Sequence, residues 1–198
     1  MPGTERPSRP FPSDGLTDRV VVLRPWHEHD LDLVTEVIST DREISRWTRI
    51  PWPYSRDLAD EWFAGQAAEL EAGTALSLAI TDAATGDLLG AVGLHRIGAE
   101  SRPGSAFFPN EIGYWLARDA RGRGACTRAV RLLVAWAFET LELEQVEVST
   151  VVGNAASERV ITRVGFVPAG EVEGLDDDAR RLRRFILVRG GRTLSADE

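Results

Sequence analysis

The chain has 198 residues, 43% of them hydrophobic, and a formal net charge of −8. This length and apolar content fit one domain with a core of its own. The negative charge opposes non-specific binding to nucleic acid, which relies on Lys and Arg neutralising phosphates, so we expect no nucleic-acid partner.

The sequence carries no sign of a membrane segment or a metal site. No apolar run approaches the roughly 18 residues of a transmembrane helix, and residues 1–10 lack the apolar stretch of a signal peptide. The single cysteine, Cys126, cannot form an internal disulfide, and the three histidines are scattered without metal-ligand spacing. We therefore expect a soluble, cytoplasmic protein with no membrane partner and no metal.

The chain divides into three predicted parts. Residues 1–15 are rich in proline and have no hydrophobic period, so they are predicted to be a disordered arm. Residues 16–190 form the folded domain, and residues 191–198 form a flexible tail.

Hydrophobic periodicity predicts strands and helices throughout the domain. In chain order they are a strand at 19–24, helices at 30–38 and 55–70, strands at 75–81, 88–97 and 111–117, a helix at 122–141, a strand at 146–152, a helix at 155–164, and strands at 166–172 and 182–189. Hairpins at both ends and helical crossovers in the middle predict an α/β fold whose central sheet is part parallel.

Between the first two helices lies a segment with several aromatic residues and two prolines. Trp47 and Trp52 are candidates for lining a substrate pocket from this segment. Packing of a loop onto the core is the preferred explanation of such aromatics, and the pocket stays open as the alternative.

A glycine-rich segment, Arg-Gly-Arg-Gly-Ala-Cys-Thr at 121–127, follows a predicted strand and opens a predicted helix. Glycines allow tight or positive-φ backbone, so that several N–H groups at a helix N-terminus can point at one anion. This predicts a pyrophosphate site, although an ordinary glycine turn has the same pattern. The segment is not a Walker loop, because no Gly-Lys-Ser/Thr follows.

Several motifs in a fixed order resemble the Gcn5-related N-acetyltransferases (GNAT), in particular the branch of ribosomal-protein N-terminal acetyltransferases. They are Glu-Ile-Gly-Tyr-Trp-Leu at 111–116, Arg-Gly-Arg-Gly at 121–124, Asn-Ala-Ala-Ser at 154–157 and Gly-Phe at 165–166. The opening from Leu16 to Pro25 is also similar. The resemblance implies a GNAT fold, with one mixed, largely antiparallel sheet of six to seven strands splayed in the middle and flanked by about four helices. It also implies transfer of an acetyl group from acetyl-CoA to an amine in a ternary complex.

The resemblance assigns cofactor-binding positions to this chain. The backbone around Trp115, Leu116 and Ala117 is expected to pair with the pantetheine amides and to hold the thioester oxygen. The glycine-rich segment is expected to wrap the pyrophosphate, and Asn154 to hydrogen-bond the pantetheine arm. The expected pyrophosphate residues are Arg121, Gly122, Arg123, Gly124, Ala125, Cys126 and Thr127, with Cys126 standing where the family has Gly or Ala.

The resemblance also suggests catalytic residues. Ser157 matches the residue that protonates the departing thiolate, although Asn154 and Ser157 are also typical of a helix cap and first turn. Glu111 is the best candidate for a general base, with a solvated strand-end carboxylate as the alternative. Tyr114 is placed on the acceptor side, and Asp176 to Asp178 are a further acceptor-side alternative.

The acceptor is the open part of this interpretation. A protein N-terminal α-amine is preferred, with a small amine such as an antibiotic or polyamine as the second choice. A non-catalytic acyl-CoA binding protein is the alternative of another class. A covalent acyl intermediate on Cys126 is rejected, because its helical position predicts burial and no histidine neighbours it in sequence. Family members are often dimers, so a homodimer remains open.

Overall fold

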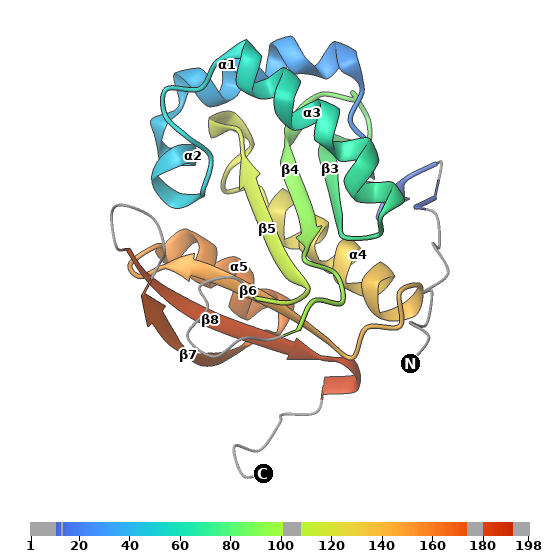
Figure 1. The fold of residues 1–198 in the computed structure, drawn as a ribbon, viewed down its shortest axis with the longest axis vertical. Helices are drawn as coiled ribbons and strands as arrows, with labels where there is room; N and C mark the ends of the chain where they lie inside the picture. The colour runs from blue at the N-terminus through green and yellow to red at the C-terminus, as the bar shows by residue number, and fades with distance from the viewer. Residues whose placement is uncertain (1–10, 13, 101–107, 174–179, 192–198) are drawn as a thin grey trace.

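The computed structural model describes residues 11–12, 14–100, 108–173 and 180–191. Strands in these residues form one eight-stranded sheet in the order β1, β2, β3, β4, β5, β6, β8, β7 (Figure 1). All neighbouring strands are antiparallel except β5 and β6. Their bounds are β1 Leu16–Thr17, β2 Val21–Arg24, β3 Ala75–Asp82, β4 Leu88–His95, β5 Glu111–Leu116, β6 Gln145–Val151, β7 Val167–Glu173 and β8 Arg181–Val188. The predicted α/β class with a mixed, largely antiparallel sheet is confirmed.

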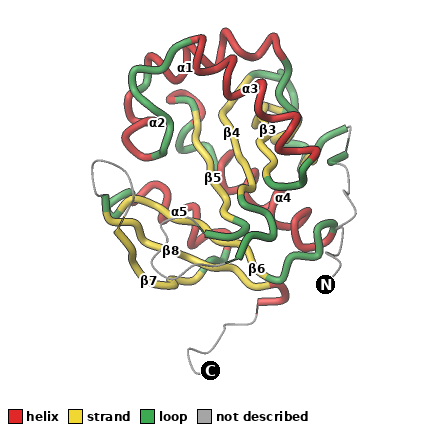
Figure 2. The backbone as a smooth tube through the Cα atoms, viewed as in Figure 1, coloured by secondary structure: helices red, strands yellow, loops and turns green. Residues whose placement is uncertain are grey.

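Helices cover both faces of the sheet (Figures 1 and 2). Their bounds are α1 Leu31–Thr40, α2 Arg42–Trp47, α3 Arg56–Glu71, α4 Ala125–Glu139 and α5 Ala155–Val164. Alternate residues of each strand face opposite sides, so each face has its own apolar core. Leu78 of β3 packs in the core with α4, whereas its neighbour Ala79 packs in the core with α1 to α3.

The described residues contain two elements more than expected, a strand and a helix. Strand β1 is only two residues long, too short to show a period in sequence. Helix α2 is six residues long and lies where a broken loop was predicted. It begins because the Asp41 side chain accepts a hydrogen bond from the Glu43 N–H at 3.3 Å and because Ile44 is buried.

The start of the ordered chain also differs from expectation. Phe11 is only 9% exposed, and its ring meets the Trp136 ring edge-on with centroids 5.5 Å apart. One large apolar side chain within the residues 1–15 that were predicted to be disordered therefore packs against α4. Residues 1–10, the tail from 192 and the Asp176 to Asp178 alternative lie outside the described residues. Among the described residues, no helix is long and apolar enough to cross a bilayer.

The middle of the sheet opens between its two parallel strands. Strands β4 and β5 pair from Gly90 with Leu116 to His95 with Glu111. Strands β5 and β6, by contrast, are in register only at Glu111 with Glu147. Beyond that pair β5 and β6 diverge, and the sheet is splayed as expected (Figure 1).

Candidate active site

The gap between β5 and β6 leaves backbone groups of β5 without a strand partner. Antiparallel pairing alternates, so every second residue of β5 directs its N–H and C=O toward β4 and the others direct theirs into the gap. The Ala117 N–H bonds the Leu89 carbonyl at 2.9 Å, which fixes the alternation. Tyr114 and Leu116 therefore present their backbone groups to the gap.

This alternation corrects part of the prediction for the cofactor strand. Ala117 donates its N–H to Leu89 and accepts the Ala120 N–H on its carbonyl at 3.0 Å, so both its backbone groups are engaged. Trp115 shares the orientation of Ala117 toward β4, and its side chain packs with α1 to α3. Of the three predicted positions, only Leu116 directs its backbone into the gap.

The glycine-rich turn at the end of β5 has the backbone that an anion site requires. Gly122 and Gly124 have φ of 78° and 84°, values that favour glycine, and no atom lies within 4 Å of where a Cβ would stand on either. No side chain caps α4, and its first internal bond runs from Arg128 N to Gly124 O at 3.2 Å. The N–H groups of the first turn of α4 therefore have no acceptor within the helix.

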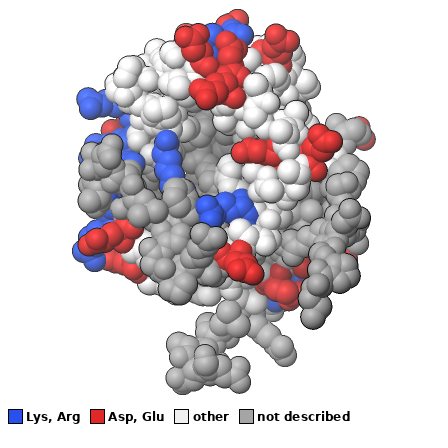
Figure 3. Space-filling model, in the orientation of Figure 1, with Lys and Arg blue, Asp and Glu red and all other residues white. Residues whose placement is uncertain are grey.

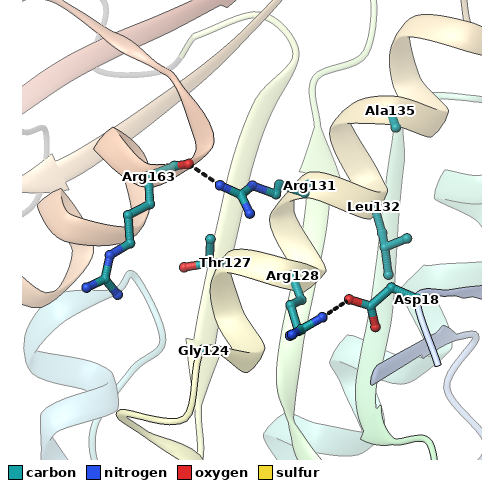
Figure 4. Close-up of a pocket in the computed structure, with 8 residues that line it drawn as sticks. All are labelled: Asp18, Gly124, Thr127, Arg128, Arg131, Leu132, Ala135 and Arg163. Atoms are coloured by element: carbon teal, nitrogen blue, oxygen red, sulfur yellow. Dashed lines mark hydrogen bonds and ion pairs between the residues drawn. The ribbon is translucent and has the colours of Figure 1, made fainter. Parts of the chain in front are cut away.

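A cleft of about 450 Å³ lies beside this helix start. Arg128, Arg131 and Arg163 supply three guanidinium groups, opposed by the single carboxylate of Asp18, which pairs with Arg128 at 2.6 Å (Figure 4). The lining residues are Asp18, Gly124, Thr127, Arg128, Arg131, Leu132, Ala135 and Arg163. The excess of positive charge at an uncapped helix N-terminus favours a phosphate-bearing ligand. Arg123 is exposed within the same turn.

The Arg121 side chain joins the glycine-rich turn to the rest of the molecule. Its Nε and Nη2 donate to the Leu116 carbonyl at 3.1 and 2.9 Å, and its Nη2 also donates to the buried Asp41 carboxylate at 2.5 Å. Because Asp41 caps α2, Arg121 connects the end of β5 with a helix that packs over β3 to β5. Its Nε and Nη2 are thus engaged by protein.

Asn154 and Ser157 lie at the far side of the gap, where β6 leads into α5. The Asn154 Oδ1 caps α5 by accepting the Ser157 N–H at 3.1 Å, so the capping alternative is correct as far as Oδ1 is concerned. The amide hydrogens on Asn154 Nδ2 remain for another acceptor. The Ser157 hydroxyl lies 2.7 Å from the Tyr114 hydroxyl.

Tyr114, which was predicted on the acceptor side, belongs to β5 and lies on the face of the sheet that α4 covers. Its side chain packs with the core under α4, and burial raises the pKa of Tyr114 far above its usual value, with the Ser157 hydrogen bond acting in the opposite direction. The phenol therefore stays protonated. Cys126 lies on the same face, where burial raises the pKa of its thiol to about 12. That thiol stays neutral, in agreement with rejecting it as a nucleophile.

Glu111 is 6% exposed at the start of β5. One of its carboxylate oxygens accepts the Ser149 hydroxyl at 2.5 Å, and the other accepts Arg49 Nη1 at 3.2 Å. Ser149 belongs to β6 and Arg49 to the α2–α3 connection, so Glu111 joins three segments at the narrow end of the gap. Neither partner was predicted, because each is more than thirty residues away in sequence and only the folded sheet brings them together.

The connection from α2 to α3 borders the same side of the sheet. Trp47 ends α2 and donates its Nε1–H to Glu43 at 2.8 Å, so its polar atom is used within the helix. Trp52 is 42% exposed. Arg180, before β8, donates to the Arg46 carbonyl at 2.8 Å and ties α2 to the other half of the sheet. On the face shown in Figure 3 the molecule is hollowed at its centre, with basic side chains at the margin.

One group of side chains has the spacing of a metal site. Ligand atoms of His27, His29 and Asp30 lie within 4.8 Å of one another. The Asp30 carboxylate is already held by two hydrogen bonds from Arg24, at 2.7 and 2.8 Å. This group precedes α1 and has no part in the gap between β5 and β6.

Comparison with known proteins gives the family. Residues 21–167 match the acetyltransferase (GNAT) domain. The chain belongs to the GNAT family. Among curated proteins this GNAT domain is 40% identical, over 86 residues, to the Bacillus subtilis protein named Putative ribosomal N-acetyltransferase YdaF. That match covers 43% of this chain and 44% of YdaF, so the chain matches less than half the length of this relative.

Solved structures show the same GNAT fold at lower identity. Mycobacterium smegmatis RimJ, in complex with CoA-disulfide, superposes with a TM-score of 0.73 at 21% identity, over 85% of this chain and 82% of RimJ. Vibrio cholerae spermidine N-acetyltransferase, in complex with CoA and spermine, superposes with a TM-score of 0.71 at 18% identity, over 88% and 98% of the two chains.

Proposed function

We propose that the protein transfers an acetyl group from acetyl-CoA to a primary amine, with a protein N-terminal α-amine as its acceptor. The observation that carries this proposal is the splayed pair β5 and β6 ending in an uncapped, glycine-rich helix start. An extended donor with a phosphate-bearing end needs both features. The splayed strands hold its extended arm, and the helix start holds its phosphate groups. GNAT membership supports the same donor.

Charge and backbone geometry define how the donor is held. The first-turn N–H groups of α4 and the arginines of the adjoining cleft donate hydrogen bonds to the phosphate groups. The backbone groups of Tyr114 and the N–H of Leu116 face the gap and supply hydrogen-bond partners for the amides of the pantetheine arm, whereas the Leu116 carbonyl already accepts from Arg121. An N–H of β5 in this position also stabilises the negative charge that develops on the thioester oxygen.

Ser157 is the group proposed to protonate the leaving thiolate. It lies at the first turn of α5, beside the gap, and its hydroxyl has a permanent neighbour in the Tyr114 phenol. A protonated phenol donates to the Ser157 oxygen, which leaves the one Ser157 hydrogen for the sulfur. Asn154 acts nearby through its Nδ2 hydrogens on the pantetheine arm.

An α-amine is the acceptor that requires the least help from this site. Amines attack only when neutral, and deprotonation at pH 7 costs about 1.4 kcal/mol for an α-amine against about 4.6 kcal/mol for a lysine side chain. The 40% identity to a protein named as a ribosomal N-acetyltransferase supports the same choice. A small polyamine is the second candidate, because a fold neighbour is a spermidine N-acetyltransferase and the net charge of −8 favours cations.

Calorimetric titration with acetyl-CoA and with CoA tests donor binding. Absence of binding to either would overturn the proposal. Release of free thiol is then followed with N-terminal peptides, an Nα-blocked lysine peptide, spermidine and an aminoglycoside. We expect turnover with N-terminal peptides. Turnover of small amines alone would replace the preferred acceptor with the second, and tight binding without any turnover would indicate a non-catalytic acyl-CoA binding protein.

A further inference from the structure

His95, the last residue of β4, lies on the sheet face that α1 to α3 cover, because it shares the orientation of Ala91, which packs there. It is directly opposite Glu111 of β5 and is exposed. Its ring lies back along the sheet over two glycines. Nε2 is 2.7 Å from where a Cβ would stand on Gly93 and 3.6 Å from the same point on Gly113.

The glycines make this ring position available. Gly93 and Gly113 are cross-strand partners, so the two strands together form a patch without side chains beneath the imidazole. A side chain on Gly93 would occupy the place of the ring, since a contact of 2.7 Å is closer than carbon and nitrogen approach without a bond. The imidazole nitrogen therefore lies over Gly113, the residue before Tyr114, and the Tyr114 backbone faces the splayed gap.

The charged groups that face His95 come from three segments. They are Glu111 of β5, Glu69 of α3 and Arg49 of the α2–α3 connection. Desolvation by the surrounding protein lowers the pKa of His95 below its ordinary value of 6.5, and it outweighs the two carboxylates, which act to raise the pKa. Arg49 lowers it further. At pH 7 the imidazole is therefore neutral and able to accept a proton.

Glu111, the base predicted from sequence, is less suited to that role. Both its oxygens already accept hydrogen bonds, one from Ser149 and one from the guanidinium of Arg49. None of the described residues hydrogen-bonds to the His95 imidazole. The exposed, neutral base on this face of β4 and β5 is His95.

We propose that His95 is the general base that takes the proton from the acceptor amine, a role that rests on the proposed function. The amine nitrogen forms a bond to the thioester carbonyl carbon, and one amine proton passes to His95 Nε2. The C–S bond breaks with its electron pair on sulfur, which receives the proton of the Ser157 hydroxyl. Exchange with solvent then returns His95 to neutral and Ser157 to its hydroxyl. The sum is amine and thioester giving amide and thiol.

An NMR titration of the protein alone, without an acceptor amine, tests the charge state of His95. The chain has three histidines, so the imidazole resonances in an NMR titration are few, and His95→Gln identifies the one that belongs to His95. We expect His95 to titrate below pH 6.5, and to titrate lower still in Glu111→Gln, because that substitution removes a carboxylate that raises the His95 pKa. A His95 that titrates above pH 6.5 in the parent protein would overturn the proposal.

Kinetics test the proton transfer itself, with an N-terminal peptide and acetyl-CoA. We expect His95→Gln to lower kcat by about 100-fold, to leave the Kd for acetyl-CoA unchanged, and to make the fall of kcat/KM below pH 6.5 shallower, because only the acceptor α-amine then titrates. His29→Gln is the matched control, because His29 is an exposed histidine before α1, and it should behave as the parent. In Glu111→Gln the acid limb should persist and move to lower pH.

Glu111 and His95, as alternative general bases, predict opposite effects of the two substitutions on the pH–rate profile. If Glu111 is the base, Glu111→Gln makes the acid limb shallower and His95→Gln keeps the parent profile, which would overturn the proposal. The two proposals also fail differently. If the parent protein does not acetylate any amine, both the proposed function and the role of His95 are wrong. If the parent protein acetylates the peptide and His95→Gln has the same pH–rate profile, only the role of His95 is wrong.

Discussion

The phenol oxygen of Tyr114 lies 2.7 Å from the hydroxyl oxygen of Ser157, across the splayed centre of the sheet. Tyr114 belongs to β5, and Ser157 belongs to α5, the helix that follows β6. The contact therefore links the two sides of the gap between β5 and β6, where the donor is proposed to bind. Burial keeps the phenol protonated. In the proposed function the phenol donates to the Ser157 oxygen, which leaves the Ser157 hydrogen for the leaving thiolate.

The Tyr114–Ser157 contact predicts non-additive effects on kcat. Ser157→Ala should lower kcat by about 100-fold, because the leaving thiolate loses its proton donor. Tyr114→Phe should lower kcat by about 3- to 10-fold, the worth of one neutral hydrogen bond. If Tyr114 acts through Ser157, the double variant has the kcat of Ser157→Ala alone. Additive losses in steady-state kinetics would show that the two hydroxyls act independently.

The glycine-rich turn predicts a specific loss of donor binding in Gly124→Glu. The new carboxylate stands at the uncapped start of α4, where it repels phosphate, so the affinity for acetyl-CoA should fall at least about 100-fold by calorimetry. Gly73→Glu is the matched control, because Gly73 has a similar φ of 64° and open space beside it but follows α3. Both variants should lose about 1–2 kcal/mol of stability from backbone strain. Equal affinities in the two variants would rule out a phosphate site at Gly124.

The Arg121 contacts predict a structural role for this side chain. Arg121→Ala leaves the Asp41 carboxylate, 5% exposed, without its closest partner, and frees the Leu116 carbonyl. We expect a loss of about 1–2 kcal/mol in the free energy of unfolding, since Arg121 itself is partly exposed. Arg118→Ala should cost less than about 0.5 kcal/mol, because Arg118 is 70% exposed and 3.5 Å from Asp41. Equal losses in denaturant titrations would contradict the assignment.

The buried Cys126 thiol predicts chemical inertness. With its pKa raised to about 12, the thiol should resist alkylation by iodoacetamide in the native protein at pH 8 and react after denaturation. Cys126→Ala keeps the backbone N–H and should retain turnover. Loss of turnover in a folded Cys126→Ala protein, or an acetylated Cys126 found by mass spectrometry, would revive a covalent route.

Local signals in the sequence were sufficient for most elements of the fold. Helix α5 was predicted with its observed bounds, Ala155–Val164, because a cap and a terminating glycine enclose an apolar period. Helix α2 was missed because its six residues are too few to show a helical hydrophobic period. The order of motifs located Asn154 and Ser157, which are the N-cap and a first-turn residue of α5.

Contacts between residues far apart in the chain could not be predicted from the sequence. The partners of Glu111 lie 38 and 62 residues away, and the Tyr114–Ser157 contact spans 43 residues. His95 gave no signal, since a lone histidine at a strand end is ordinarily just solvated. Only the strand register, which places it over two glycines and opposite Glu111, gives it a role.

The most direct test of acetyl transfer to an α-amine is mass spectrometry of a peptide that offers both a free N-terminus and a lysine, incubated with the protein and acetyl-CoA. The protein itself contains no lysine, so acetylation of its own lysine side chains cannot consume the donor. We predict one acetyl group, on the N-terminal nitrogen, and its loss in Ser157→Ala at matched times. An unmodified peptide, or an acetyl group found only on lysine, would contradict the account.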